Sequence, residues 1–185
     1  MTDLPNLPIV FDDVFADNDM FHIYEELVNM NEWKYDVTSM RQGLLGNVSD
    51  HRFWGIKLLN DNTNYFNDIC PSWITQILPY LDHRTDNKLE LCNRKMSFAH
   101  FNGQTFGQDG QFHHDPNITV FVNVGPIPWK EEWGGDFIQL DADGKESIYS
   151  FKPGRCMIVD GTKPHKGLGP LVKDILRVTL AIHLE

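Results

Sequence analysis

The most informative stretch of the chain is residues 113–124, which read HHDPNITVFVNV. Its second half, residues 118–124, is rich in β-branched and aromatic residues and therefore predicts a strand. The Asp109-Gly110 pair upstream is a turn signal, and Pro116 prevents a helix from continuing across the stretch. Residues 111–115 are accordingly expected to be extended backbone that leads into this strand.

The spacing of His113 and Asp115 suits a metal ion. In extended backbone, side chains two positions apart point to the same side, so these two residues can hold one ion while His114 points away. In a helix they would lie roughly 200° apart. Together with the later His165 they form the two-histidine, one-carboxylate triad that binds non-haem ferrous ion and leaves three coordination positions open. The His-x-Asp pair alone is common in solvated loops, so the prediction depends on the whole set.

The end of the chain predicts a strand with two different faces. Val178, Leu180, Ile182 and Leu184 alternate with Arg177, Thr179, Ala181 and His183. The apolar face should pack on helices, and the face that carries Arg177 and Thr179 should line a barrel interior. A buried arginine needs a partner. Two partners are possible: the carboxylate of a bound dicarboxylate, or an Asp or Glu of the protein at the end of the strand.

Two helical patterns precede the β-rich half. After a short strand at residues 7–11, apolar residues recur at helical spacing from Phe21 to Val28, with residues 17–19 placed to cap that helix. A second helix is expected after Pro71, which suits a first helical position. Its expected buried face consists of Trp73, Ile74, Ile77, Leu78 and Leu81. Strands are expected at residues 89–101, 111–115, 118–124, 136–141, 146–151, 155–160 and 175–184.

Helices followed by many closely spaced strands predict an α+β fold: a double-stranded β-helix, or jelly roll, with N-terminal helices packed on one sheet. The 185 residues are expected to form a single domain. Its helical support should span about residues 1–87 and its jelly-roll core about residues 88–185. Residues 39–67 are interpreted as either an ordinary surface loop or a lid over the substrate.

The composition of the chain limits which classes of partner and which cellular compartment are expected. The formal net charge is 16 − 26 = −10, which argues against a nucleic-acid partner because phosphate contacts need clustered Lys and Arg. No apolar run approaches the length of a membrane span, and the aspartate-rich start does not resemble a secretory signal. Cys70, Cys92 and Cys156 are odd in number and far apart, which predicts reduced thiols in a cytoplasmic protein.

Five stretches together resemble the iron- and 2-oxoglutarate-dependent dioxygenases, in particular their prolyl 4-hydroxylase-like branch. They are HFNGQTFGQDGQFHHD at residues 100–115, WGGDF at 133–137, KPGR at 152–155, DGTKPH at 160–165 and RVTLA at 177–181. Their order and spacing match the family, and the match covers roughly residues 88–185. The helical front half is compatible with it.

The resemblance implies roles for six residues. The Fe(II) ligands would be His113, Asp115 and His165. Arg177 would pair with the distal carboxylate of 2-oxoglutarate, and Thr179 would hydrogen-bond the same group. The family often has a tyrosine in place of His100, where its hydroxyl touches the co-substrate. His100 is interpreted either as a replacement for that tyrosine, through a hydrogen bond or a positive charge, or as an ordinary core histidine. His22, His51, His83 and His183 are given no role.

The implied reaction is hydroxylation of an unactivated C–H bond, with consumption of O2 and conversion of 2-oxoglutarate to succinate and CO2. Ascorbate is a further candidate cofactor. Asp115 favours hydroxylation over halogenation, since a related halogenase would lack that carboxylate. The expected substrate is a prolyl residue in a peptide or protein, or a small molecule such as free proline. Trp129, Trp133 and Phe137 would stack on a peptide or pack in the core.

Two other functions stay open. A cupin-like metalloenzyme that does not use 2-oxoglutarate would leave Arg177 without a role. A non-catalytic jelly-roll binding module would not require the metal triad and the arginine to occur together.

Overall fold

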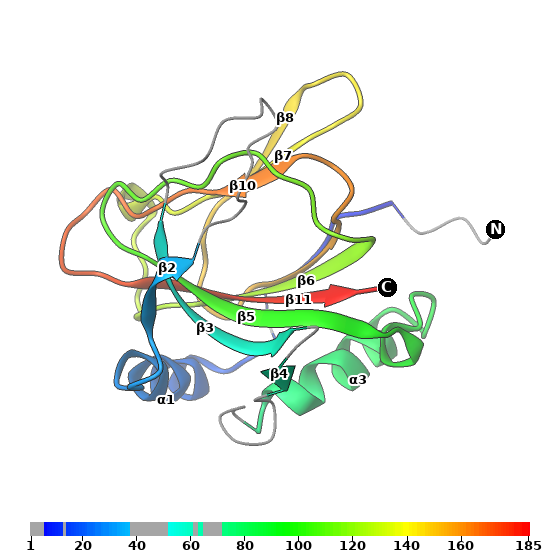
Figure 1. Cartoon of the computed structure of the whole chain (residues 1–185), viewed down its shortest axis with the longest axis horizontal. Coiled ribbons are helices and arrows are strands. Elements are labelled where there is room, and N and C mark those ends of the chain that lie inside the picture. The colour runs from blue at the N-terminus through cyan, green and yellow to red at the C-terminus, as the bar shows by residue number, and fades with distance from the viewer. Residues whose placement is uncertain (1–5, 13, 38–51, 61–62, 65–71) are drawn as a thin grey trace.

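Two antiparallel sheets face each other in the computed structural model, and two helices lie against the outer face of the larger sheet (Figure 1). The structure describes residues 6–12, 14–37, 52–60, 63–64 and 72–185. This layering is the expected α+β jelly roll with helices on one sheet. None of the helices in the described part of the chain is long and apolar enough to cross a membrane.

The larger sheet has β11 at its centre. Its order is β1 (Ile9–Phe11), β9 (Cys156–Asp160), β6 (Ile118–Val124), β11 (Arg177–Leu184), β5 (Met96–Gln104), β3 (Phe53–Asn60) and β2 (Lys34–Val37), with β4 (Thr63–Asn64) paired to β3. The smaller sheet is ordered β10 (His165–Gly167), β7 (Phe137–Leu140) and β8 (Glu146–Tyr149). An isolated bridge from His113 to His165 extends the smaller sheet by one residue.

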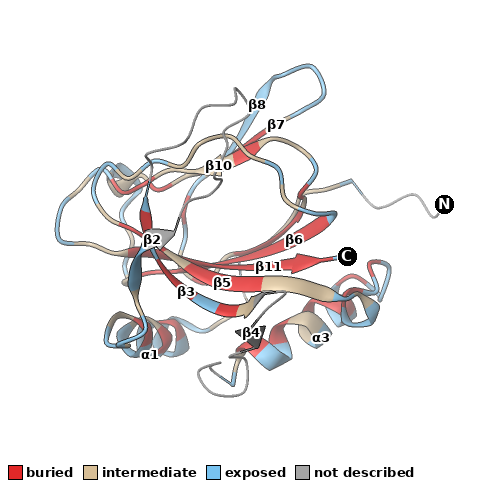
Figure 2. Ribbon diagram, in the orientation of Figure 1, coloured by how far each residue is buried: buried red, intermediate tan, exposed pale blue. Residues whose placement is uncertain are grey.

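Strand alternation sorts the side chains of the larger sheet into a core face and an inner face. The apolar residues of β6 and β11 form one buried cluster with the two long helices, α1 (Asp17–Val28) and α3 (Ile74–Arg84). The intervening residues of these strands face the smaller sheet. Figure 2 shows the centre of the larger sheet buried, whereas β8 is an exposed edge strand. The prediction for residues 175–184, an apolar face toward the helices, is confirmed.

The helices differ in detail from their predicted ends. Ala16 is the N-cap residue of α1 and makes no side-chain cap hydrogen bond, so the predicted capping by residues 17–19 is wrong. Asp17 and Asp19 lie in the first turn, where the positive end of the helix dipole favours acidic side chains. The second helix, α3, begins at Ile74, and Pro71 lies outside the described residues.

Some strand predictions also need correction. The predicted strand 89–101 begins instead as a 3₁₀ turn, η1 (Leu91–Asn93), and β5 starts at Met96 and runs on to Gln104. Residues 53–60, expected to belong to a loop, form β3 inside the larger sheet. The region expected to be helical support therefore also contributes strands. The remainder of the predicted loop, apart from residues 52 and 63–64, lies outside the described residues.

The predicted turn at Asp109-Gly110 is not formed: the turn lies a few residues earlier, where the Gln108 N–H donates to the Thr105 carbonyl oxygen at 3.1 Å. Leu140 and Glu146 are the paired residues next to the turn of the β7–β8 hairpin, and this turn contains Gly144 with φ +77°. Cys92 and Cys156 are free thiols, as expected, and Cys70 lies outside the described residues. A second 3₁₀ turn, η2 (Glu131–Trp133), precedes β7.

Candidate active site

A cavity of about 290 Å³ lies between the two sheets, and residues from both line it. One wall is the inner face of β11, which presents Arg177, Thr179, Ala181 and His183 in a row. Cross-strand neighbours on β5 and β6 extend this wall, for example Asn102 and Asn123 on either side of Thr179. All six residues predicted for the site from the sequence line this one cavity or lie at it.

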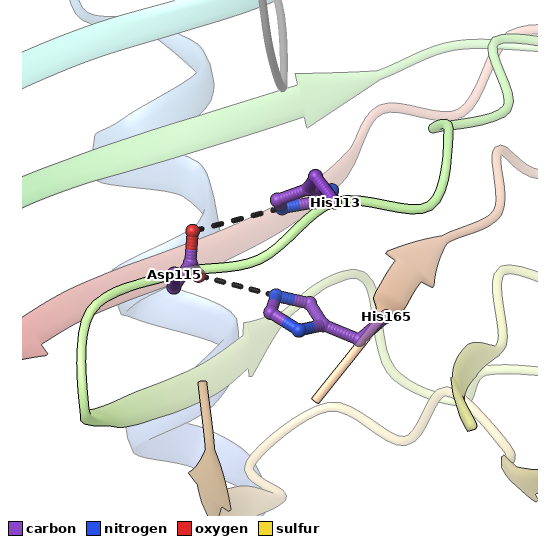
Figure 3. Close-up of side chains that lie close together, drawn as sticks. All are labelled: His113, Asp115 and His165. Carbon is purple, nitrogen blue, oxygen red and sulfur yellow. Dashed lines mark hydrogen bonds and ion pairs between the residues drawn. The ribbon is translucent and has the colours of Figure 1, made fainter. Parts of the chain in front are cut away.

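The three side chains of the predicted triad lie close together beside β10, the strand of the smaller sheet that begins at His165 (Figure 3). His113 and His165 are brought together by their bridge, and their rings lie 4.5 Å apart between centroids. His165 Nε2 lies 3.1 Å from Asp115 Oδ2, and His113 Nε2 lies 3.8 Å from Asp115 Oδ1. One ligand atom from each residue lies within 4.8 Å of the others. His114, as predicted, points away and is exposed, with its Nδ1 2.7 Å from the Thr162 carbonyl oxygen.

The hydrogen bonds of the two histidines show that a cation fits between them and Asp115. The Nδ1 atoms of His113 and His165 lie 2.8 Å from the carbonyl oxygens of Gln111 and Lys163, respectively. A carbonyl only accepts, so each Nδ1 carries the proton and a neutral ring turns its Nε2 lone pair toward the carboxylate. Two acceptors that face each other repel unless a cation lies between them. Neighbouring ligands of an octahedral ion at ~2.1 Å would be about 3 Å apart, close to the separations seen here.

Burial and the neighbouring charges determine the protonation states of His113 and Asp115. Burial, and then the neighbouring His165, lower the pKa of His113, which keeps its ring neutral. Burial raises the pKa of Asp115, but the three neighbouring histidines outweigh burial and hold that pKa below its ordinary value. A neutral imidazole and an ionised carboxylate are the forms in which these groups bind metal.

Arg177 is a buried cation that forms no ion pair with a carboxylate of the described residues. Its Nε donates to the Gly135 carbonyl oxygen at 2.7 Å and its Nη1 donates to Gln104 Oε1 at 2.6 Å. Among the described residues, no Asp or Glu forms an ion pair with it. Burial lowers the pKa of Arg177 to about 9, partly offset by Asp136, so the side chain is still cationic at neutral pH. The alternative prediction, a protein salt bridge at the strand end, is therefore not met within the described residues.

Gly135 makes room for that arginine. Its φ is +89°, and a Cβ there would lie 3.1 Å from Arg177 Cδ. Gly134 also has positive φ, at +65°. The Gly-Gly step therefore serves both the turn into β7 and the close passage of the arginine side chain.

Thr179 and His100 present unpaired polar atoms at the cavity. Within the described ranges, the buried Thr179 Oγ1 and His100 Nδ1 have no hydrogen-bond partner. His100 Nε2 lies 2.9 Å from the amide nitrogen of Asn102, which donates, so the proton of a neutral ring is on Nδ1. Burial and the neighbouring His183 lower the pKa of His100 to about 3, so the suggested positive charge at this residue is wrong.

One site residue was missed. His183 had been given no role, yet it lines the cavity with its Nε2 3.3 Å from Asp115 Oδ2. Burial lowers the pKa of His183, an effect that the nearby Asp115 partly offsets. The sequence did hold a signal, since His183 shares the alternating face that carries Arg177 and Thr179.

Of the aromatic residues near the site, Phe137 lines the cavity, whereas Trp129 and Trp133 pack against other side chains. Phe137 is buried, lines the cavity and packs on His165 with ring centroids 5.5 Å apart. Trp129 packs between Trp133 and Phe151, and neither tryptophan lines the cavity. For the tryptophans this favours packing over stacking on a peptide in this cavity.

No protein-family sequence model matches the chain, and no curated protein matches it by sequence. Solved structures do match its fold. A prolyl-4-hydroxylase of Pseudomonas putida has a TM-score of 0.67 at 15% identity, covering 96% of this chain and 92% of that one. A prolyl hydroxylase of Trichoplax adhaerens, in complex with a hypoxia inducible factor peptide fragment, has a TM-score of 0.64 at 14% identity. The match covers 97% of this chain and 84% of that one.

A third match is the viral collagen prolyl hydroxylase of Paramecium Bursaria Chlorella virus-1 in its 2-oxoglutarate complex. Its TM-score is 0.63 at 11% identity, covering 97% of this chain and 96% of that one. Coverage of both chains is nearly complete, whereas identity is low. The chain therefore has the double-stranded β-helix fold of the prolyl hydroxylases and their 2-oxoglutarate-Fe(II) oxygenase relatives.

Proposed function

We propose that the chain is an Fe(II)- and 2-oxoglutarate-dependent dioxygenase that hydroxylates an unactivated C–H bond. The observation that carries the proposal is that one cavity contains both the candidate metal triad and the buried Arg177, which forms no ion pair with a carboxylate of the described residues. Because Arg177 and the triad line the same cavity of about 290 Å³, a small dicarboxylate could reach from the arginine to the metal.

The protein's own residues would each have a defined task. His113, Asp115 and His165 would hold Fe(II), with both rings oriented by their Nδ1–H hydrogen bonds to backbone carbonyls. Arg177 would pair with the distal carboxylate of 2-oxoglutarate, with Thr179 Oγ1 as a further donor. When bound with O2, the metal and the co-substrate supply the oxidising chemistry of C–H hydroxylation.

The apolar side of the cavity would keep the reacting centre dry. Phe121, Phe137 and Met157 line it and are at most 8% exposed. His100, with its unpaired Nδ1–H, is the further candidate contact to the co-substrate. This role would take the place of the tyrosine hydroxyl that the family often has there.

For the substrate, we propose a prolyl residue in a peptide or protein. The support is the fold likeness to several prolyl hydroxylases, one of them solved with a peptide fragment. A small-molecule substrate is the alternative. The cytoplasmic location and the use of ascorbate stay predictions.

The test is an anaerobic titration of the metal-free protein with Fe(II) and 2-oxoglutarate, following the weak visible charge-transfer band of the chelate. Wild type should develop the band, and His113→Ala should not. The matched control is Lys145→Met, which removes an exposed cation in the β7–β8 turn and should behave as wild type.

Each outcome selects one of the three functions. Iron binding without the band would contradict the role of Arg177 and favour a metalloenzyme that does not use 2-oxoglutarate. Failure to bind iron would favour a binding module. If the band appears, succinate formation that depends on added prolyl peptides then tests the substrate.

A further inference from the structure

His183 is a fourth metal-ligand-type side chain at the triad that the proposed function does not use. It lies on β11 with 11% of its side chain exposed, and its Nε2 is 3.3 Å from Asp115 Oδ2. The same oxygen lies 3.1 Å from His165 Nε2 and 3.4 Å from Thr119 Oγ1. Asp115 Oδ2 is therefore contacted from three sides.

The packing around His183 fixes the direction of its ring. His183 lies between Phe98 on β5 and Thr119 on β6 in the strand register. Its ring centroid is 5.4 Å from that of Phe98 and 5.6 Å from that of His100. A side chain held in this way by two strands of the central sheet is pre-set to face Asp115.

The hydrogen-bond partners distinguish His183 from the two predicted ligands. At His113 and His165 the Nδ1 atom faces a backbone carbonyl, which leaves Nε2 as a bare lone pair for a metal. For His183, the polar contact seen within the described residues is that of its Nε2 with the Asp115 carboxylate, at 3.3 Å. A carboxylate only accepts, so a neutral His183 that hydrogen-bonds to it carries its proton on Nε2.

We propose that His183 is a positioning residue: it donates its Nε2–H to Asp115 and fixes the rotation of that carboxylate toward the metal. This inference rests on the proposed function. A fourth protein ligand would leave only two positions of the octahedron, too few for a bidentate co-substrate together with dioxygen. As a donor, His183 leaves all three positions open.

The first test needs no variant and no activity. Long-range ¹H–¹⁵N NMR spectra of the wild-type protein loaded with Zn(II), a diamagnetic probe, report which nitrogen of each ring carries a proton. We expect His183 to be protonated at Nε2, and His113 and His165 to be protonated at Nδ1 with Nε2 bound to the metal. Zn(II)-shifted resonances of His113 and His165 beside an unprotonated Nε2 in His183 would overturn this inference alone. Unchanged resonances of His113 and His165 would contradict the metal site itself, and the inference would fall with it.

The second test separates a donor from a ligand. His183→Phe keeps a ring of similar size but removes the donor, and His183→Gln keeps an N–H donor. Co(II) affinity should fall roughly 10–100-fold in the Phe variant, as for other residues that orient a metal ligand, and should recover most of that loss in the Gln variant. The matched control, His83→Gln on the exposed side of α3, should bind as wild type.

Two results of the second test would overturn the inference. Wild-type Co(II) affinity in a folded His183→Phe protein would show that the hydrogen bond does not matter. Complete loss of binding in both His183 variants, equal to that of His113→Ala, would identify His183 as a ligand. Thermal unfolding by circular dichroism establishes that each variant is folded, and the NMR test stands on the wild type alone.

Discussion

Arg177 is the residue whose role is easiest to separate from that of the metal. Arg177→Met should weaken 2-oxoglutarate binding by roughly 10–100-fold, since hydrogen bonds to a charged group contribute about 1.5–3 kcal/mol. Fe(II) binding without the co-substrate should change little, because Arg177 does not belong to the triad. Anaerobic titrations of the metal alone and of both components measure the two affinities. An equal loss of both would contradict the assignment.

Gly135 offers a second test of the same contact. A Cβ at Gly135 would crowd Arg177, whereas one at Gly144 would meet nothing within 4 Å, and both residues have positive φ. Gly135→Ala and Gly144→Ala should each lose about 1–2 kcal/mol of stability from backbone strain. Only Gly135→Ala should also weaken 2-oxoglutarate binding. Equal affinities in the two variants would show that Arg177 tolerates displacement.

His100 should make the metal-free protein sensitive to acid. Its pKa is lowered to about 3 in the folded state, against an ordinary value of about 6.5 in the unfolded chain. Between these values the unfolded chain binds more protons, so the free energy of unfolding should fall as the pH is lowered from 6.5 toward 3. Urea titrations across this range should give a shallower fall for His100→Gln than for wild type. Parallel curves would contradict a neutral, buried His100.

At the scale of residues, the sequence predicted that His113, Asp115 and His165 come together, but it did not predict everything around them. His113 and Asp115 were predictable because the spacing of two ligands on extended backbone is a local property. For His183, the alternation indicated only its face of the strand. Its contact with Asp115 was not predictable, because that contact depends on the register that sets β11 beside β6. His100 stayed ambiguous for the same reason: its partners come from strand pairing, which no single stretch of sequence specifies.

At the scale of elements, Asp82 joins the end of α3 to the following 3₁₀ turn. Its carboxylate accepts from the backbone N–H of Leu91 at 2.6 Å and of Cys92 at 2.8 Å. Asp82→Ala would leave both donors without this acceptor, at a cost of about 1–3 kcal/mol for the buried Leu91 N–H and less for the more accessible Cys92 N–H. Asp82→Asn keeps one acceptor oxygen and should lose about half as much.

Urea unfolding measures this loss. Glu25→Ala, on the exposed side of α1, is the matched control and should change the midpoint little. An Asp82→Ala protein as stable as this control would mean that η1 is not held by the carboxylate.

The strands β6 and β3 show why one strand was predicted from the sequence and another was missed. β6 matched its prediction at both ends because every residue from 118 to 124 suits a buried strand. β3 was missed because its inner face includes Gly55 and the cavity-lining Lys57, which break the apolar alternation. A strand that lines a polar cavity therefore lacks the regular alternation of apolar and polar residues by which a strand is predicted from sequence.

At the scale of the whole molecule, Cys156 can report opening of the larger sheet. It is fully buried in β9, between β1 and β6, and burial raises the pKa of its thiol above the ordinary value. With Cys70 and Cys92 replaced by serine, its reaction with a thiol reagent should require the sheet to open. Fe(II) and 2-oxoglutarate, each at about 100 times its dissociation constant, should slow the reaction roughly 100-fold or more. An unchanged rate would indicate local release of the edge strand β1.

The position of β11 links the synthesis of the chain to its chemistry. This strand is the last element in the sequence, yet it fills the gap between β5 and β6 and carries Arg177. A nascent chain that already contains His113, Asp115 and His165 still lacks the central strand of the larger sheet and Arg177. Under the proposed function, an incompletely translated polypeptide therefore cannot bind 2-oxoglutarate through Arg177, and it does not consume oxygen and 2-oxoglutarate in the absence of a substrate.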